Sequence, residues 1–475
     1  MKGNRIIFGW IVLLMGLLCS VKVGATDVDS EQGLRDAINR GDSYIRLTKT
    51  IELKQTITVS QGNITLDLAG CSIYNGSYKQ IWTKYYEIDI FDITGGTLVI
   101  QGTGSIANRE TEEHSTIWVN GGNLELRGGT ISKDSPAGGW GSGVPAVVVE
   151  NGGTFKMFGG AISSHKATWY SYGLRIKSGS FLMEGGEIKT TKSASAMTAI
   201  ALDIQGGQIS LKKGTIFSAD RAISSIYNWG QILLVGYGIY KDGSLQSSSG
   251  TTVDGTIEIK PISYTIKYSG VDPEREGSYD VTQGTVSLSE EIKRGYDFDG
   301  WFDKVGKVTA ITYANVSSHS DQYVYTLTAQ WTIHNYTITY YSEGKEITSV
   351  GSNPKIYKIG NNAALRPISK GDAEFIGWKD RGTGQIITNL PGNDPRDLQL
   401  DAVWDKKYNI TFVTGTDESI PEISTTTSKE VTIPTPKEKK GYTFDCWSDG
   451  KGNTIHDKIS ANIYESDIIL TAVWI

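Results

Sequence analysis

The chain has 475 residues, 56 of them glycine, and a net charge of −6. This length is sufficient for several domains. The acidic balance argues against a nucleic-acid-binding protein, because such proteins present an excess of Lys and Arg to the phosphates.

The beginning of the chain has the features of a secretory leader. Two basic residues precede a largely apolar run over residues 6–18, and Ala25 completes a small-residue cleavage site. The run is too short to serve as a membrane span. We therefore predict that residues 1–25 are a signal peptide and that the exported chain begins at Thr26.

The first part of the mature chain combines one helix with short strands. Residues 29–39 predict an amphipathic helix with Ser30 as its N-cap. Strand-like segments follow at 44–47, 51–53 and 57–59. We expect the helix to cover an exposed edge of the fold that follows.

One pattern occurs six times between residues 95 and 239: a glycine, a short apolar–polar alternation, a second glycine cluster and an isoleucine. The aligned glycines lie 26, 31, 26, 28 and 23 residues apart and are Gly96, Gly122, Gly153, Gly179, Gly207 and Gly230. Repetition at this period is typical of a solenoid. The six copies therefore predict one structural unit that stacks on itself.

Each copy predicts three short strands separated by turns. Apolar residues alternate with polar ones on both sides of the aligned glycine, which is the period of a strand with one buried face. The isoleucines that close the copies form one column, Ile106, Ile131, Ile162, Ile188, Ile216 and Ile239. Coils stacked about 4.8 Å apart would bury this column. We predict an all-β chain in which residues 26–260 form a right-handed parallel β-helix (a solenoid), with residues 241–256 as final coil and linker.

The opening of this solenoid resembles a known class. The segments GLRDAIN, TITVS and NITLDLAG resemble the start of secreted pectate-lyase-like β-helix proteins. The resemblance covers about residues 26–260. It implies the fold and leaves the activity open.

A second repeat family occupies the rest of the chain. Its units open on YTIKY (264–268), YTITY (336–340) and YNITF (408–412), which start 72 residues apart, and they close on AQW or AVW. The middle segments are GYDFDGW, AEFIGW and GYTFDCW. These landmarks resemble the Listeria–Bacteroides repeats, the internalin-type B repeats of bacterial surface proteins. Ala373 and Glu374 stand where the motif has glycine and an aromatic residue.

The resemblance implies three small β-rich, β-grasp-like modules. We assign them to residues 261–332, 333–405 and 406–475. The spacing predicts four to five strands in each. Trp301 and Trp331 recur with apolar neighbours, so we expect both in the core of the first module.

A polysaccharide-degrading β-helix would carry its chemistry on the outward side chains of one sheet. One outward column reads Asp92, Trp118, Arg175 and Asp203, with Val148 or Glu150 in the third copy. Asp92 and Asp203 lie four coils apart, about 19 Å, whereas glycoside hydrolysis needs carboxyls roughly 5–9.5 Å apart. Arg175 between Glu150 and Asp203 only weakly matches a lyase site. We expect an outward ladder of ion pairs and predict no catalytic residue.

The histidines give no further sign of a catalytic or metal site. None of the five has the spacing of a metal site. His114 and His165 fall in loop sequence, where we expect them to be solvated. We therefore predict neither a metal ion nor a cofactor.

Aromatic residues gather in the long loops of the solenoid. Because these loops leave one corner, their side chains are a candidate platform for stacking sugar rings. The alternative is that they pack on one another as a satellite core. The sequence leaves both open. The candidate glycan-binding residues are Trp82, Tyr85, Trp140, Trp169, Tyr170 and Tyr172.

Together these features predict an exported, surface or secreted, adhesin-like protein without catalytic activity. Its partner would be a polysaccharide, or a glycan or protein on a host or bacterial surface; we predict no nucleic-acid partner and no membrane span. Two alternatives stay open. One is a polysaccharide lyase or glycoside hydrolase that acts on the outer face of the β-helix, and the other is a structural stalk. The sequence does not indicate an oligomeric state.

Overall fold

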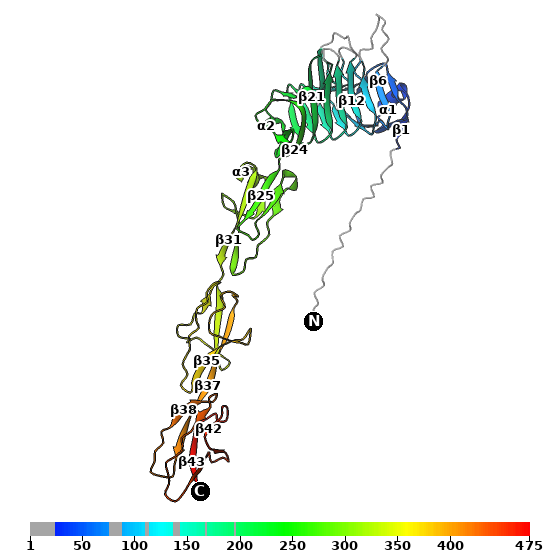
Figure 1. The fold of residues 1–475 in the computed structure, drawn as a ribbon. Helices are drawn as coiled ribbons and strands as arrows, with labels where there is room; N and C mark the ends of the chain where they lie inside the picture. The colour runs from blue at the N-terminus through cyan, green and yellow to red at the C-terminus, as the bar shows by residue number, and fades with distance from the viewer. Residues whose placement is uncertain (1–23, 76–87, 110–113, 136–142, 167–168, 194–195) are drawn as a thin grey trace, which may run out of the picture. The chain divides into compact units, whose positions relative to one another are not determined.

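The computed structural model shows a chain that is almost entirely β-structure (Figure 1). It describes residues 24–75, 88–109, 114–135, 143–166, 169–193 and 196–475. The N-terminal part is the predicted right-handed parallel β-helix, and the C-terminal part is a series of smaller β-sheets. The fold class predicted from the repeats is therefore confirmed.

A helix and four short strands begin the fold. They are β1 (Thr26–Val28), α1 (Glu31–Arg40), β2 (Tyr44–Leu47), β3 (Ile51–Leu53) and β4 (Ile57–Val59). The predicted N-cap is confirmed, because the Ser30 hydroxyl accepts a 3.2 Å hydrogen bond from the Gly33 N–H. The helix ends at Gly41, whose φ of +79° suits a residue without a side chain. Its apolar face is buried against the first coil.

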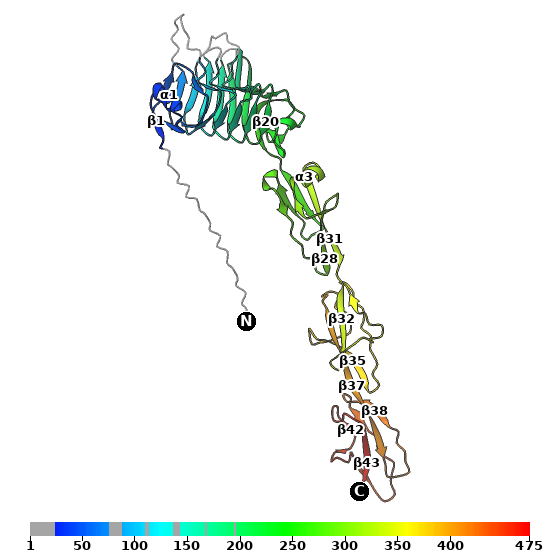
Figure 2. The same ribbon diagram turned by 180° about the vertical axis from the view of Figure 1, so that it is seen from behind.

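Three parallel arrangements of strands form the β-helix (Figures 1 and 2). The first sheet contains β1, β2, β5 (Asn63–Asp67), β8 (Thr97–Gln101), β11 (Asn123–Leu126), β14 (Thr154–Met157), β17 (Ser180–Met183) and β20 (Gln208–Leu211). The second contains β3, β6 (Ser72–Asn75), β9 (Ser105–Asn108), β12 (Thr130–Ser135), β15 (Ala161–Lys166), β18 (Glu187–Lys192) and β21 (Gly214–Ser225). The third contains β4, β7 (Phe91–Ile93), β10 (Ile117–Asn120), β13 (Val147–Glu150), β16 (Trp169–Ile176) and β19 (Ala196–Ile204), and it joins the second through β21.

The apolar columns predicted from the alternation form the core. All six isoleucines of the closing column are completely buried. The first five are in register where β9, β12, β15, β18 and β21 pair, whereas Ile239 lies on the next strand and pairs antiparallel with Ile259. In the first sheet, Phe155 and Phe181 stack with ring centroids 5.2 Å apart. A fully buried side chain of this kind contributes roughly 1.5–3 kcal/mol. One continuous cluster of such residues therefore holds the coils together.

The sixth copy of the pattern departs from the prediction. Where an alternating strand was expected, residues Trp229–Ile232 form a short helix, α2. Asn228 and Gln231 cap its start reciprocally, and this local hydrogen bonding favours a helical turn over a strand. Ile232 is buried as predicted, but Leu234 is 40% exposed. The last coil is thus replaced by a cap.

Residues 241–256, which were predicted as final coil and linker, instead contribute to antiparallel strands. They contain β23 (Ser244–Leu245) and the first half of β24 (Thr252–Pro261). Strand β24 pairs antiparallel with β21 and with β22 (Tyr237–Lys241). An antiparallel hairpin therefore covers the last edge of the β-helix, which protects its free backbone groups from pairing with other chains.

Smaller sheets follow, beginning with one of five strands. In order they are β26 (Arg275–Tyr279), β25 (Tyr264–Ser269), β31 (Val324–Ile333), β28 (Tyr296–Phe302) and β29 (Lys307–Val308). Beside it are a two-stranded sheet and two helices. The sheet pairs β27 (Val286–Ser287) with β30 (Ala310–Ile311), and the helices are the 3-10 helix η1 (Val281–Gln283) and α3 (Tyr313–His319).

The rest of the chain repeats this plan around one long strand. The remaining strands are β32 (Tyr336–Ser342), β33 (Lys345–Ile347), β34 (Ile356–Tyr357), β35 (Ala373–Asp380), β36 (Ile386–Ile387), β37 (Leu398–Val413), β38 (Ile423–Thr426), β39 (Val431–Thr432), β40 (Phe444–Ser448), β41 (Thr454–Ile455), β42 (Lys458–Ile459) and β43 (Ile468–Trp474). Strand β37 pairs with β32 through its first half and with β43 through its second. Each half serves a separate apolar cluster.

Equivalent tryptophans mark the cores of the modules. Trp301, Trp378 and Trp447 are almost completely buried, so the expectation for Trp301 is confirmed. The expectation for Trp331 is wrong, because its side chain is only partly buried. It lies near the end of β31, at the rim of the module, where its Nε1 donates a 2.8 Å hydrogen bond to the Gly270 carbonyl.

Candidate functional site

The predicted outward column lies on the third sheet of the β-helix. Strand pairing aligns Asp92, Trp118, Val148, Arg175 and Asp203 on β7, β10, β13, β16 and β19. Val148, and not Glu150, occupies the third coil. Of the expected ladder of ion pairs, one pair forms within the described column, where Arg175 Nε lies 2.7 Å from Asp203 Oδ2.

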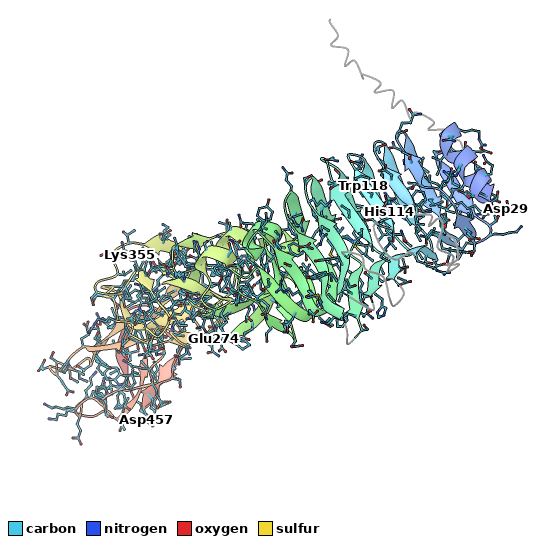
Figure 3. All side chains as sticks on the ribbon, turned by 90° about the horizontal axis from the view of Figure 1, so that it is seen from above. Asp29, His114, Trp118, Glu274, Lys355 and Asp457 are labelled. Atoms are coloured by element: carbon cyan, nitrogen blue, oxygen red, sulfur yellow. The ribbon has the colours of Figure 1, made fainter. Side chains whose placement is uncertain are left out.

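A hollow of about 390 Å³ opens on this face beside the column. It spans the edge of β7 to β16, and the polar and aromatic side chains that line it include Asp89, His114, Trp118, Glu150, Arg175 and Lys177. Figure 3 shows Trp118 and His114 on the same part of the β-helix. His114 was expected to be a solvated loop residue, but it leads directly into β10 and lines the hollow.

The indole of Trp118 is held in place by a charged neighbour. Its Nε1 donates a 2.8 Å hydrogen bond to Glu150 Oε1, and the other carboxylate oxygen lies 2.9 Å from Lys177 Nζ. A charge-assisted hydrogen bond of this kind restricts the ring to one orientation. The carboxylate and the ammonium also compensate each other, so this part of the hollow presents little net charge.

Two carboxyl groups at the β7 end, those of Asp89 and Asp92, have pKa values that are raised by burial. Burial raises the pKa of Asp89, although His114, with Nδ1 3.5 Å from Asp89 Oδ2, opposes the shift. Burial, and then the charge of Asp89, raises the pKa of Asp92. Within the part of the chain that the structure describes, the buried Asp92 Oδ1 accepts no hydrogen bond. An unmet acceptor is costly in a protein interior when it is charged, which agrees with the raised pKa of this carboxyl.

The aromatic residues predicted as a platform are only partly described. Trp82, Tyr85 and Trp140 lie outside the described residues, as does the side chain of Trp169, which begins β16. The rings of Tyr170 and Tyr172 stack 6.1 Å apart at 21°. The Arg175 guanidinium lies 4.0 Å above the Tyr172 ring. The two tyrosines therefore lie next to the Arg175–Asp203 ion pair on the same sheet.

Among the described residues, no group of three or more His, Cys, Asp or Glu side chains is placed to hold a metal ion. The same residues include no helix with the length and apolar character that a bilayer crossing requires.

Sequence analysis did not identify Asp89 or the partnership of Trp118 with Glu150. Asp89 lies before β7, at the bend that leads into the strand, where strict alternation no longer tells which side chains face outward. The available signal was the pair of aspartates three residues apart in IDIFDI, residues 88–93. Glu150 is aligned with Asn120 by strand pairing, and only that register shows that its carboxylate is near Trp118.

The chain is similar to one repeat family and to two larger bacterial proteins. Residues 408–473 match the family model of the Listeria-Bacteroides repeat domain, in agreement with the resemblance seen in the sequence. A putative Gly-rich membrane protein of Evansella cellulosilytica is 22% identical over 217 residues, 44% of this chain and 24% of the relative. A putative membrane protein of the same bacterium is 24% identical over 196 residues, 40% of this chain and 28% of the relative. The chain thus spans about a quarter of the length of these relatives.

Proposed function

We propose that this protein is exported to a bacterial surface and binds carbohydrate in the hollow on the third sheet. The surface location is supported by the repeat domain at 408–473, by the membrane-protein names of the relatives and by the leader-like sequence at residues 1–25. The binding role rests on one observation, the indole of Trp118 fixed beside hydrogen-bonding groups whose charges are largely compensated.

The chemistry of the hollow suits a polyhydroxylated ligand. An aromatic face packs against the C–H groups of a sugar ring, while carboxylate oxygens accept hydrogen bonds from its hydroxyls. Glu150, which lines the hollow, supplies such a carboxylate beside the indole. A volume of about 390 Å³ falls in the range of small-molecule sites, roughly 300–1,000 Å³.

A second candidate function is glycoside hydrolysis. It is favoured by two carboxyls of different character on one face: the raised pKa of Asp92 suits a proton donor, whereas Glu150 is paired with Lys177. Such a contrast between two carboxyls is the pattern used by glycosidases. Release of oligosaccharides, lost in Asp92→Asn and in Glu150→Gln, would favour this function over binding alone.

Binding is tested with the chain from Thr26 and a panel of plant, bacterial and mucin polysaccharides. Trp118→Ala is expected to weaken binding of the recognised glycan about ten-fold or more, as for the loss of an aromatic anchor. The matched control is Phe217→Ala, which removes a half-buried outward ring from the second sheet. Equal affinity of wild type and Trp118→Ala would refute the proposed site.

A further inference from the structure

The modules carry a second aromatic feature at their rims. Trp331, Trp404 and Trp474 occupy equivalent positions and are all half-buried. Their Nε1 atoms donate to the Gly270 carbonyl at 2.8 Å, the Ser342 hydroxyl at 2.9 Å and the Thr414 carbonyl at 2.8 Å. A phenylalanine packs against each indole, with ring centroids 5.1, 5.5 and 5.7 Å apart. Each tryptophan is therefore fixed in orientation while part of its surface stays accessible.

In the first and third modules a lysine lies over this tryptophan and over a tyrosine. Lys293 Nζ is 4.4 Å from the Tyr296 ring centroid and 5.7 Å from that of Trp331. Lys439 Nζ repeats this geometry, at 4.9 Å from Tyr442 and 5.8 Å from Trp474. Across the described residues neither ammonium is within ion-pair or hydrogen-bonding distance of a protein acceptor.

The second module has lost this arrangement. Strand register places Phe375 at the position of Phe444, so Ala373 stands where the third module has Tyr442. Sequence alignment had placed Ala373 one residue away, at the glycine position. Lys370 still lies 5.9 Å from the Trp404 ring, but its ammonium is paired with Glu343 and lies 3.8 Å from Asp372. The middle module thus keeps the tryptophan without the tyrosine or the free cation.

Surface hollows lie beside the two complete arrangements, and Tyr442 lines the hollow of the third module whereas Tyr296 is not part of the lining in the first. The one in the third module has a volume of about 840 Å³, and its lining includes Glu438, Lys439, Lys440, Tyr442 and Trp474. Two cations thus face one carboxylate there. The one in the first module measures about 430 Å³ and includes Asp272, Glu291, Ile292, Lys293 and Trp331. Its Glu291 is paired with Arg275, which leaves Asp272 against Lys293.

We propose that the hollow of the third module binds an acidic glycan, and that the hollow of the first module binds the same ligand more weakly. The sugar ring packs on Tyr442 and Trp474, while its carboxylate or sulfate is paired with Lys439 and Lys440. An ammonium held over aromatic rings stays charged, so without a protein carboxylate it offers an anion a preorganised partner. The excess of lysine over acid distinguishes the third hollow from the first.

The experiment uses the chain from Thr26 with Trp118→Ala, so that the hollow on the β-helix does not contribute. Calorimetric titration compares two matched pairs of probes, oligogalacturonate with its methyl ester, and dextran sulfate with dextran. Binding of an acidic member, but not of its neutral partner, is expected. The affinity should fall as salt is raised, because exposed charges are screened. The pair that responds identifies the carboxylate or the sulfate as the acidic group.

Variants assign the binding to the modules. Lys439→Ala and Tyr442→Ala are each expected to weaken binding about ten-fold, and Lys293→Ala by a smaller factor. Tyr442 is 56% exposed, so its loss should leave the melting temperature unchanged. Lys370→Ala is the matched control and should have no effect. Equal binding of acidic and neutral probes, or unchanged affinity in Lys439→Ala, would overturn the proposal.

A rebuilt site provides an independent test. Ala373→Tyr combined with Glu343→Gln restores the tyrosine and frees Lys370 from its main partner. This double variant is expected to raise the number of acidic ligands bound per chain. Unchanged stoichiometry, with the fold intact by circular dichroism, would contradict the assignment to the lysine, tyrosine and tryptophan.

Discussion

The β-helix and the repeat modules bury their side chains in different ways. In the β-helix, each inward residue lies in a column of similar residues supplied by neighbouring coils, as in the isoleucine column of the second sheet. In the modules, a single buried tryptophan contacts a few aromatic partners of the same unit, as Trp447 does with Phe412 and Phe444. The first core is continuous and the second is divided.

Because the two cores are built differently, the removal of one side chain should affect different neighbours in each. Stacked coils gain stability from nearest-neighbour interfaces, so a defect in one coil weakens the coils on both sides. A module closes its core within its own residues, as the two separate clusters along β37 indicate. Calorimetry of the chain should therefore resolve separate transitions for the β-helix and the modules.

The largest expected effect is the loss of a module's central ring. Trp447→Ala should reduce the unfolding free energy of the third module by about 3–5 kcal/mol, because a fully buried indole leaves a cavity. Trp474→Ala is the control and should cost less, since that ring is only half-buried. Scanning calorimetry should show a module transition that moves and a β-helix transition that does not. A shift of the β-helix transition would contradict the division of the cores.

A deletion in the isoleucine column should have the complementary effect. Ile162→Ala is expected to cost about 2–5 kcal/mol and Ile162→Val about 0.5–1.5 kcal/mol. Ile162 is completely buried between Ile131 and Ile188, so both neighbouring coils lose contacts. The β-helix transition should shift and the module transitions should stay unchanged. A cost below that of an exposed substitution would show that the column is not tightly packed.

Close stacking of the coils is tested at two glycines with similar backbone angles. Gly179 (φ +90°) has no room for a side chain, because a Cβ there would lie 2.2 Å from the Gly153 carbonyl oxygen. Gly152 (φ +79°) has nothing within 4 Å. Gly152→Ala should cost about 1–2 kcal/mol for the left-handed backbone alone. Gly179→Ala should add about 1–3 kcal/mol for the steric conflict. Equal shifts of the β-helix melting temperature would argue against this spacing.

Acid should distinguish the two regions through carboxyls with opposite shifts. Burial alone would raise the pKa of Asp405, but hydrogen bonds from Ser428 and Thr427 outweigh it and lower the pKa to about 2. Because this pKa is below the usual value, the ionised form stabilises the contact between Asp405, at the end of the second module, and the third module. The contribution is complete above about pH 4 and is lost as pH falls towards 2. Hydrogen bonds to a charged group contribute about 1.5–3 kcal/mol.

Two variants measure this dependence by denaturant unfolding from pH 6 to 2. Asp405→Asn should lower the stability of the second and third modules at pH 6 and flatten their decline below pH 4. Asp92→Asn should act in the opposite direction on the β-helix, because the raised pKa of Asp92 makes its ionised form unfavourable. It should therefore stabilise the β-helix at pH 6 and have less effect in acid. Parallel declines in wild type and Asp405→Asn would refute the role of Asp405.

The sequence predicted those features that depend on periodicity. The isoleucine column, Ser30 as N-cap and the buried Trp301 follow from repeats and local hydrogen bonding, which act over a few residues. The short helix that Asn228 caps was missed because Gly230, Ile232 and Ile239 match the repeat pattern as well as the residues of the five preceding copies do. Trp331 was misplaced because recurrence shows that a residue matters to a module without showing whether it lies in the core or at the rim.

The candidate site was harder to predict because it depends on contacts between coils. Asp89 and Glu150 come from different loops and strands, and their relation to Trp118 depends on register and on bends that break the alternation. Sequence reasoning identified the outward column and the Arg175–Asp203 pair, since both follow from counting residues back from a glycine. The module boundaries and the platform at Trp82, Tyr85 and Trp140 stay predictions.

The smallest expected effect concerns the helix that covers the first coil. Ser30→Ala removes the hydroxyl that accepts from the Gly33 N–H, which should cost about 1 kcal/mol. Ser30→Asp is the control and should keep most of the stability, because aspartate caps equally well. Because the cap contacts only the first turn of α1, the β-helix transition should shift slightly as a whole, without a new transition. A separate early transition would instead show that α1 unfolds independently of the coils, and the continuous core would then begin at the first coil and not at the helix.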